Sequence, residues 1–527
     1  MTVERVACLA FDSPGISMLN AGLAAGRLPT LARLLDGGRA VSLVDHQEIA
    51  TSASWPTLIR GCELPDHGLG SDRAFAQSEY RIEHLDVASA PRPPFWRYLS
   101  DAGVRSVVLS AYSAPMLDDF HGAQVTGWGS HDPFEGKLGR FRSDPPELLG
   151  ELERLVGRRA IRYDPMRPRT PRQVRAYVSD MVRGCEQQRR ALEHMLSRTP
   201  DWRFAWASFG ECHQAGHLLW NFADPEHSDY VAEAPADVRD GLMRVYEATD
   251  RAIGGVIEGL PEGTAVLVVS PYDMAPNHHL DEVLQLVLER GGWAVRAAGK
   301  DATMRVRSLA AGRRVVRALV PLGLRPALGR LAGRDRLLAE LDAGLLDWRA
   351  TRALKVPSDG SAAVRLNLAG REPAGCVQPG ADAERTLGDL AEALAELRCA
   401  DTGRPLVVRV ARYEELYEGV EPFTGPADLY IEWAHVPRPR AVRSDRVGEV
   451  EVPAARSNQS LHHTPGFAIA WGAGTEPEGG ARLPGMGEAR LADVGATVLA
   501  LLGIAPPPEI TGRSIAELAP ADAAAGA

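Results

Sequence analysis

Two histidines, His213 and His217, lie four residues apart in the sequence. This spacing places both imidazoles on one face of a helix. Imidazole pairs with this spacing are a common arrangement for binding zinc. The same pattern also occurs on helix surfaces that bind no ion, so a metal site here requires further ligands from other segments.

Polar side chains border four of the predicted strands. Continuous apolar runs at 6–11, 204–208, 265–270 and 467–471 predict strands that are covered on both faces. Ligands of open α/β sheets bind beyond the carboxyl ends of the strands, so the residues at strand ends are the candidates. They are Asp12 and Ser13 after the first run, Glu211, Cys212, His213 and His217 after the second, Tyr272 and Asp273 after the third, and His462 and His463 before the fourth. We expect these four segments to meet at one edge of the sheet.

A hydroxyl-rich segment, 51–57 (TSASWPT), lies between a predicted strand at 41–44 and the apolar pair Leu58 and Ile59. This order predicts that the hydroxyls of the segment, among them that of Thr51, stand at the start of a helix. There the positive end of the helix dipole helps a hydroxyl to carry negative charge or to approach an anion. The alternative interpretation is an ordinary Ser/Thr N-cap, which stabilises the helix and has no chemical role.

The elements that must position these residues are strands alternating with helices. Helical patterns occur at 28–35, 171–198 and 237–258, and a further buried strand is predicted at 106–110. Alternation of this kind predicts the α/β class, as a three-layer α/β/α sandwich with a mostly parallel central sheet. We assign 1–300 and 350–519 to this core. The Leu-, Ala- and Arg-rich segment 301–349 is predicted to be a helical insertion, small strands to be inserted after residue 350, and 520–527 to be a frayed tail.

The composition is that of a globular protein. The chain has 527 residues, 45% hydrophobic and 24% charged, with a formal net charge of −10. This acidic balance argues against a nucleic-acid partner. Six scattered cysteines without a CxxC pair predict thiols in a reducing compartment. We find no leader peptide and no apolar run long enough to span a membrane, so we expect a cytoplasmic protein without a membrane partner. The sequence does not predict the oligomeric state.

Taken in order, a set of short motifs resembles the alkaline phosphatase superfamily. The closest resemblance is to its type I phosphodiesterase/nucleotide pyrophosphatase group and the related predicted phosphohydrolase/phosphomutase proteins. The motifs cover nearly the whole chain in the family's order, and the ordered set is more specific than any one of them. They are Phe11 with Asp12, 26–34 (GRLPTLARL), 51–61 (TSASWPTLIRG), 64–68 (LPDHG), Gly216 with His217, 270–274 (SPYDM), 364–375 (VRLNLAGREPAG), 462–466 (HHTPG), 493–503 (DVGATVLALLG) and 511–513 (TGR).

The resemblance implies a site with two metal ions, which brace an in-line displacement at phosphorus or sulfur. Thr51 occupies the position of the attacking nucleophile. Asp12 occupies the position of a ligand to the metal beside that nucleophile. His217 and one of His462 and His463 occupy ligand positions of the other metal.

The sequence departs from the family pattern at the metal ligands. His213 stands where the family has an aspartate four residues before its histidine, so this site becomes one of neutral imidazoles. Pro271 and Tyr272 stand where an aspartate and a histidine bind the metal on the nucleophile side. Proline offers no side-chain ligand, and tyrosine is an uncommon zinc ligand. Asp273 can complete this second site only if the turn shifts.

One zinc ion is therefore predicted, with ligands drawn from His213, His217, His462 and His463. A second metal would depend on Asp12 and Asp273. The expected function is that of a metal-dependent hydrolase of phosphate esters, similar to phosphodiesterases and nucleotide pyrophosphatases, acting on a small anionic substrate. Either Thr51 attacks, with Asp12 or Asp273 as its base, or a metal-bound water attacks directly. Two alternatives keep the fold: a group-transfer enzyme with a single zinc, and a non-catalytic binding protein.

Overall fold

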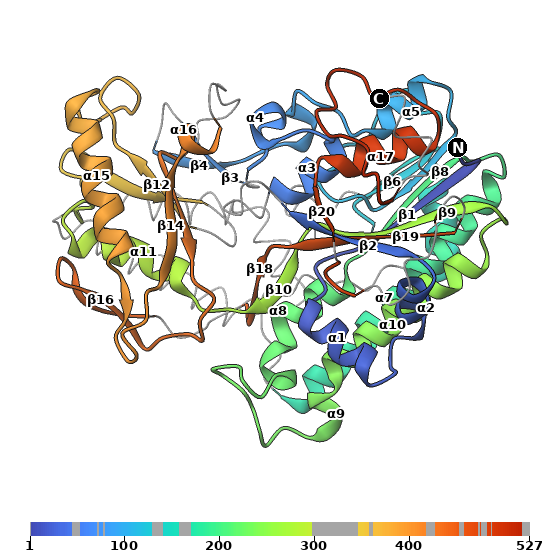
Figure 1. The fold of residues 1–527 in the computed structure, drawn as a ribbon, viewed down its shortest axis with the longest axis horizontal. Coiled ribbons are helices and arrows are strands. Elements are labelled where there is room, and N and C mark those ends of the chain that lie inside the picture. The colour runs from blue at the N-terminus through green and yellow to red at the C-terminus, as the bar shows by residue number, and fades with distance from the viewer. Residues whose placement is uncertain are drawn as a thin grey trace, which may run out of the picture. The chain divides into compact units, whose positions relative to one another are not determined.

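The computed structural model describes residues 2–44, 53–70, 73–76, 80–128, 141–157, 170–297, 346–357, 362–417, 427–452, 458–472, 475, 482–485 and 487–518. The chain divides into two compact units, which are treated separately below (Figure 1). The first unit comprises Met1–Gly70, Asp86–Asn277 and Ala454–Ala527, and the second comprises Ser71–Leu85 and His278–Pro453. The predicted helical insertion at 301–349 lies outside the described residues up to residue 345, and the predicted tail at 520–527 lies wholly outside them.

A nine-stranded sheet forms the centre of the first unit. Its strands are β1 (Arg5–Phe11), β2 (Arg39–Val44), β5 (Ser106–Leu109), β6 (Gly122–Thr126), β7 (Arg142–Asp144), β8 (Phe204–Phe209), β9 (Thr264–Ser270), β19 (Gly466–Gly472) and β20 (Gly487–Arg490). Their spatial order is β20-β2-β19-β9-β1-β8-β5-β6-β7. Only β19 and β7 run antiparallel to their neighbours, which confirms the predicted α/β class with a mostly parallel sheet.

Helices cover both faces of this sheet (Figure 1). One face carries α1 (Ile16–Ala24), α2 (Pro29–Asp36), α6 (Leu148–Val156), α7 (Pro171–Arg198), α8 (Glu211–Ala223), α9 (Ala236–Arg239) and α10 (Gly241–Glu258). The other face carries α3 (Ser54–Arg60), α5 (Trp96–Asp101) and α17 (Asp493–Leu501), and the short α4 (Leu64–His67) follows α3. The three layers are those of the predicted α/β/α sandwich.

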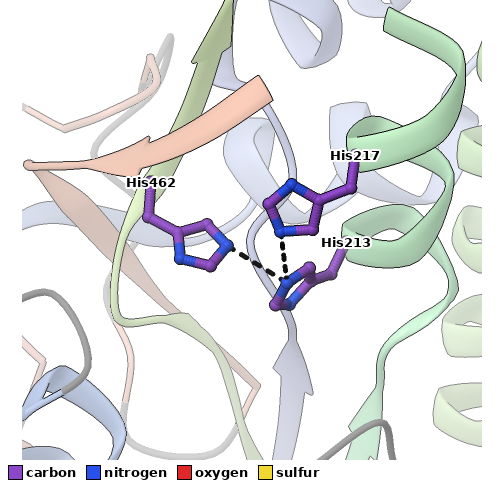
Figure 2. A group of neighbouring side chains, drawn as sticks. All are labelled: His213, His217 and His462. Carbon is purple, nitrogen blue, oxygen red and sulfur yellow. Dashed lines mark hydrogen bonds between the residues drawn. The ribbon is translucent and has the colours of Figure 1, made fainter. Parts of the chain in front are cut away.

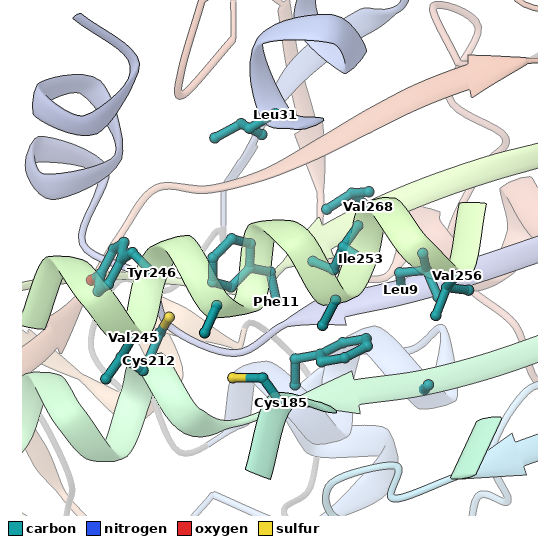
Figure 3. Packing of buried hydrophobic residues seen from close by; sticks show 14 of the residues in the cluster. Leu9, Phe11, Leu31, Cys185, Cys212, Val245, Tyr246, Ile253, Val256 and Val268 are labelled. Atoms are coloured by element: carbon teal, nitrogen blue, oxygen red, sulfur yellow. The ribbon is translucent and has the colours of Figure 1, made fainter. Parts of the chain in front are cut away.

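The two cores follow from the alternation of side chains along the strands. In β1, Leu9 and Phe11 belong to the core on one face, whereas Val6 and Cys8 belong to the core on the other. Figure 3 shows residues of α10 directed toward Leu9 and Phe11, and the ring centroids of Phe11 and Tyr246 lie 6.3 Å apart. β1 lies in the middle of the sheet and is buried on both faces from Val6 to Phe11, and all six of these residues are apolar.

The two long predicted helices are both present in the structure. The first, α7, coincides with the predicted 171–198 and begins with a capping box, in which the side chains and backbone N–H groups of Thr170 and Gln173 bond reciprocally. The second was predicted at 237–258 as one helix. The structure divides it into α9 and α10, with Asp240 between them paired to Arg27.

A two-stranded antiparallel sheet, formed by segments far apart in the sequence, lies next to the central sheet. It consists of β10 (Asp273–Pro276) and β18 (Ser460–His463), with Asp273 opposite His463 and Met274 opposite His462. The following strand, β19, runs antiparallel to β9. The start of β19 therefore lies at the edge where β1, β8 and β9 end, which brings the segment before β19 to the residues that follow those three strands.

The second unit contains small antiparallel sheets and two long helices. Its four-stranded sheet has the order β11-β12-β15-β14 and its three-stranded sheet the order β13-β16-β17, with a separate β3-β4 pair. The elements are β3 (Arg73–Ala76), β4 (Arg81–His84), α11 (Leu280–Arg290), β11 (Ala353–Val356), β12 (Ala362–Leu366), α15 (Ala381–Ala395), β13 (Arg398–Cys399), β14 (Val407–Arg412), α16 (Tyr413–Leu416), β15 (Leu429–Trp433), β16 (Ala441–Ser444) and β17 (Gly448–Glu451). The segment 364–375 is held by ion pairs from Arg365 to Glu372 and from Arg371 to Asp428. In neither unit does the described part of the chain contain a helix long and apolar enough to cross a membrane.

Candidate metal centre

Helix α8 starts directly after β8 and carries both histidines of the HxxxH pair. The junction is Gly210, where a Cβ atom would lie 1.9 Å from the Tyr112 hydroxyl oxygen. The lack of room for a side chain at this junction accounts for the glycine. His213 and His217 then lie one helical turn apart, as their spacing predicted, and both rings are at the carboxyl end of β8.

The rings of His213, His217 and His462 converge (Figure 2). The Nε2 atom of His213 lies 2.9 Å from that of His217 and 3.1 Å from that of His462. One ligand atom from each ring lies within 4.8 Å of the others, which is the grouping that a single metal ion requires. Two of the rings come from α8 and the third comes from β18, almost 250 positions later in the chain.

Hydrogen bonds on the far sides of two rings fix which nitrogen atoms carry protons. Nδ1 of His213 lies 2.7 Å from the Asp12 carboxylate, and Nδ1 of His217 lies 3.0 Å from the backbone carbonyl of Ser460. Both partners are acceptors, so each Nδ1 donates a proton and each Nε2 carries a lone pair. Two lone pairs that face each other at 2.9 Å repel unless a cation lies between them. This donor set fits a metal ion that binds to the Nε2 atoms.

Burial keeps His213 and His217 neutral. It lowers the pKa of His213 well below the usual value, with a smaller contribution from the neighbouring His217. Burial also lowers the pKa of His217 to about 4, against the opposing effects of the Ser460 carbonyl and Asp12. Both rings are therefore unprotonated at Nε2 at neutral pH, which is the form that binds a metal.

Asp12 lies at the end of β1 and is completely buried. One carboxylate oxygen contacts Nδ1 of His213, and the other accepts a hydrogen bond of 2.9 Å from the Trp55 indole. The sequence placed Asp12 at the site as a metal ligand or a base. In the structure, Asp12 contacts the group of three histidines through His213, at the ring nitrogen that faces away from His217 and His462.

Asp273 and His463 form a separate pair beside the three histidines. Oδ1 of Asp273 accepts the backbone N–H groups of Ile16 and Met274, each at 2.6 Å, and Oδ2 lies 3.2 Å from Nε2 of His463. Burial raises the pKa of Asp273 to about 7, against these two backbone hydrogen bonds, and burial lowers the pKa of His463. The histidine that joins His213 and His217 is therefore His462.

Three contributions to the site were not predicted. Trp55 donates to Asp12, Ser460 accepts from His217, and the Tyr272 ring stacks on His462 with centroids 4.5 Å apart and planes inclined by 19°. The sequence contained a signal only for Tyr272, which stands at a family ligand position. Every residue has a backbone carbonyl, so the residue type at position 460 does not indicate that its carbonyl accepts a hydrogen bond from His217. Thr51 lies outside the described residues, so its place as nucleophile stays a prediction.

No protein-family model matches the chain, and no curated protein matches its sequence. Solved structures match over nearly its whole length. A phosphonoacetate hydrolase from Sinorhizobium meliloti 1021, in complex with phosphonoformate, matches with a TM-score of 0.52 and 13% identity, over 95% of this chain and 96% of that one. The alkaline phosphatase PafA matches with a TM-score of 0.52 and 11% identity, over 98% and 99%. The chain thus has the alkaline phosphatase superfamily fold that its motifs predicted.

Proposed function

We propose that this protein is a metal-dependent hydrolase of phosphate esters that uses one zinc ion, bound by His213, His217 and His462. The observation that supports this most strongly is the 2.9 Å approach of two imidazole nitrogens whose other nitrogens are held in the proton-donating state. A cation is the partner that makes this arrangement stable. The fold supports the choice of a phosphoryl substrate by analogy only.

The ligand set favours zinc among the common ions. Three neutral imidazoles suit a borderline-soft ion, whereas magnesium and calcium prefer oxygen ligands. Three protein ligands leave the fourth position of a tetrahedral ion open, as in catalytic zinc sites. Bound there, zinc would polarise a phosphoryl oxygen and withdraw charge from it.

The other residues of the site divide the remaining tasks. Asp273 has a pKa of about 7, which is suitable for a group that accepts and returns a proton near neutral pH. His463, 3.2 Å away, can share that proton. Thr51 supplies the attacking hydroxyl in the covalent route, because it stands at the nucleophile position of the resemblance. If water attacks instead, Thr51 is not needed.

Charge at the site favours a phosphodiester over a phosphate monoester. The three imidazoles are neutral ligands, and Asp12 is the buried carboxylate that contacts one of them. When Asp273 is protonated, a divalent ion and the Asp12 carboxylate together carry a net charge of about +1, which matches the single negative charge of a diester. We therefore expect small phosphodiesters as substrates.

A substrate panel tests this function. The purified protein is incubated with a phosphodiester, a phosphate monoester, a nucleotide pyrophosphate and a sulfate ester, with and without added Zn²⁺ or Mn²⁺. We expect metal-stimulated hydrolysis that is fastest for the diester or the pyrophosphate. Products in which the phosphoryl group has passed to an acceptor other than water would identify a group-transfer enzyme instead. Metal binding without turnover of any ester would identify a binding protein.

A further inference from the structure

The Asp12 carboxylate lies behind His213 and not among the three converging Nε2 atoms. It contacts Nδ1 at 2.7 Å, while Nε2 of the same ring faces His217 and His462. The two nitrogens of an imidazole point away from each other. Asp12, which contacts Nδ1 of His213, therefore lies on the side of the ring away from His217 and His462. Asp12 is nevertheless fixed, because the Trp55 indole N–H holds its second oxygen.

The contacts of Asp12 with His213 and Trp55 matter because its carboxylate is completely buried. Asp12 has no exposed surface, so protein donors must replace the water that would otherwise solvate its charge. The Trp55 indole and the His213 Nδ1–H are two such donors. Trp55 is itself fixed among aromatic rings, with centroids 5.2 Å from Tyr112 and 6.2 Å from Trp206. The carboxylate therefore has a defined position from which to orient the imidazole.

From this geometry we infer that Asp12 and Trp55 form a positioning pair, which holds His213 in the tautomer and orientation that present Nε2 to the metal. The inference rests on the proposed function, because it assumes that the three histidines bind an ion. A carboxylate that accepts the outer N–H of a ligand histidine fixes the ring and strengthens its bond to the metal. Asp12 thus acts through His213 and does not bind the ion.

Two departures of the sequence from the family that it resembles lie at these residues. His213 replaces a shorter aspartate, and its ring contacts Asp12 at Nδ1 and faces His217 and His462 at Nε2. Tyr272 replaces a ligand and stacks on the ring of His462. The first change keeps a ligand at the site of His217, and the second replaces a ligand of the other metal by a ring that packs against the proposed zinc site.

Zinc affinity measured by competition with a chelator tests the pair. We compare the wild-type protein with Asp12→Asn, Asp12→Ala and Trp55→Phe. The amide oxygen of Asn still accepts from Nδ1 but carries no charge, so we expect affinity to fall by about 10-fold in Asp12→Asn and about 100-fold in Asp12→Ala. Trp55→Phe removes the donor to Asp12 and should weaken binding less than Asp12→Ala.

Two variants serve as matched controls. Asp250→Asn changes another buried carboxylate, whose contacts include the backbone N–H groups of Thr30 and Leu31 in α2. Trp433→Phe changes a buried indole in the second unit. Both should keep the wild-type zinc affinity. Equal losses in these controls would mean that the Asp12 and Trp55 effects come from general destabilisation, which would overturn the inference.

Two spectroscopic measurements distinguish positioning from direct binding. The visible bands of cobalt-substituted Asp12→Asn should keep their wild-type positions, because the same three nitrogens bind the ion; a shift in the bands would make Asp12 a ligand. In the metal-free wild-type protein, ¹⁵N spectra of labelled histidines should show His213 protonated at Nδ1 and not at Nε2, with the signal assigned by its loss in His213→Gln. This second measurement does not depend on the folding of any Asp12 variant.

The outcomes separate this inference from the proposed function. If the wild-type protein binds zinc and Asp12→Ala binds it equally well, the positioning pair is wrong and the metal site stands. If the wild-type protein binds no zinc, the proposed function and the pair's role toward a metal both fail, even where His213 shows the Nδ1-protonated form. A His213 ring protonated at Nε2 in the metal-free protein would also overturn the inference.

Discussion

His462 and His463 are neighbours in the sequence but have different partners in the structure. Both lie on β18, where successive side chains point to opposite sides. His462 reaches His213, whereas His463 pairs with Asp273. The sequence left the choice between them open because both are histidines at the same strand end. The side of β18 on which each histidine lies decides between them, and this side depends on the register of the pairing with β10.

The first prediction separates the two residues by metal content. His462→Ala should purify without tightly bound zinc, because it removes one of three ligands. His463→Ala should retain zinc, because its ring lies outside the group of three. Elemental analysis of both variants, purified without chelator, measures this. Loss of zinc in His463→Ala together with retention in His462→Ala would reverse the assignment.

The second prediction concerns the attacking group. Thr51→Ala should lower turnover by about two orders of magnitude or more if the threonine hydroxyl attacks. Asp12→Ala should cause a loss of similar size, through the orientation of His213. Steady-state kinetics at saturating zinc are the measurement. If Thr51→Ala keeps most of the activity while His217→Ala loses it, water attacks directly and the covalent route is wrong.

At the scale of elements, the site depends on where strands end and helices begin. The i,i+4 spacing predicted that His213 and His217 share a helix face, and α8 confirms it. The alternation of strands and helices predicted the sheet edge at which the segments meet. The Asp12–Trp55 contact was not predictable in this way, because it depends on how α3 packs against β1 in three dimensions.

The third prediction concerns the junction between β8 and α8. Gly210→Ala places a methyl group 1.9 Å from the hydroxyl oxygen of Tyr112, whose side chain is buried. Overpacking of this kind should lower the free energy of unfolding by about 1–3 kcal/mol. Gly388→Ala in α15 is the matched control, because its Cβ meets no atom within 4 Å. Urea unfolding should show the control at wild-type stability or above.

The fourth prediction uses the contact between α4 and α3. Nδ1 of His67 accepts the backbone N–H of Leu69, so Nε2 carries the proton and donates to Thr57 at 3.0 Å. Burial lowers the pKa of His67 well below 6.5, with a smaller effect from Arg60. The unfolded ring gains a proton as the pH falls through 6.5, so this contribution to stability is present above that pH and is lost below it.

Between pH 7 and pH 5 this loss amounts to about 2 kcal/mol for one histidine. The variant His67→Gln cannot titrate, so its free energy of unfolding should fall by about 2 kcal/mol less than that of the wild type over this interval. Urea unfolding at the two pH values measures the difference. Equal losses in the two proteins would show that His67 is protonated in the folded state.

At the scale of the whole molecule, the order of motifs predicted the fold although sequence identity to solved relatives of that fold is only 11–13%. The positions of buried strands and of turns can stay the same when individual side chains change. The order of motifs can therefore indicate a fold even where sequence identity is low. The second unit was harder to predict. Its segments 71–85 and 278–453 are far apart in the sequence, and their strands are short and antiparallel. Local periodicity does not show which of such strands pair.

The measurement that tests the central claim most directly is a zinc titration of the metal-free protein, followed by hydrolysis of a phosphodiester. Activity should rise with added zinc and level off at about one equivalent per chain, because the described part of the chain contains one group of three histidines that could hold an ion. His217→Ala should stay inactive over the same range. Activity that needs no metal, or that levels off only at two equivalents, would contradict a single zinc centre at these histidines.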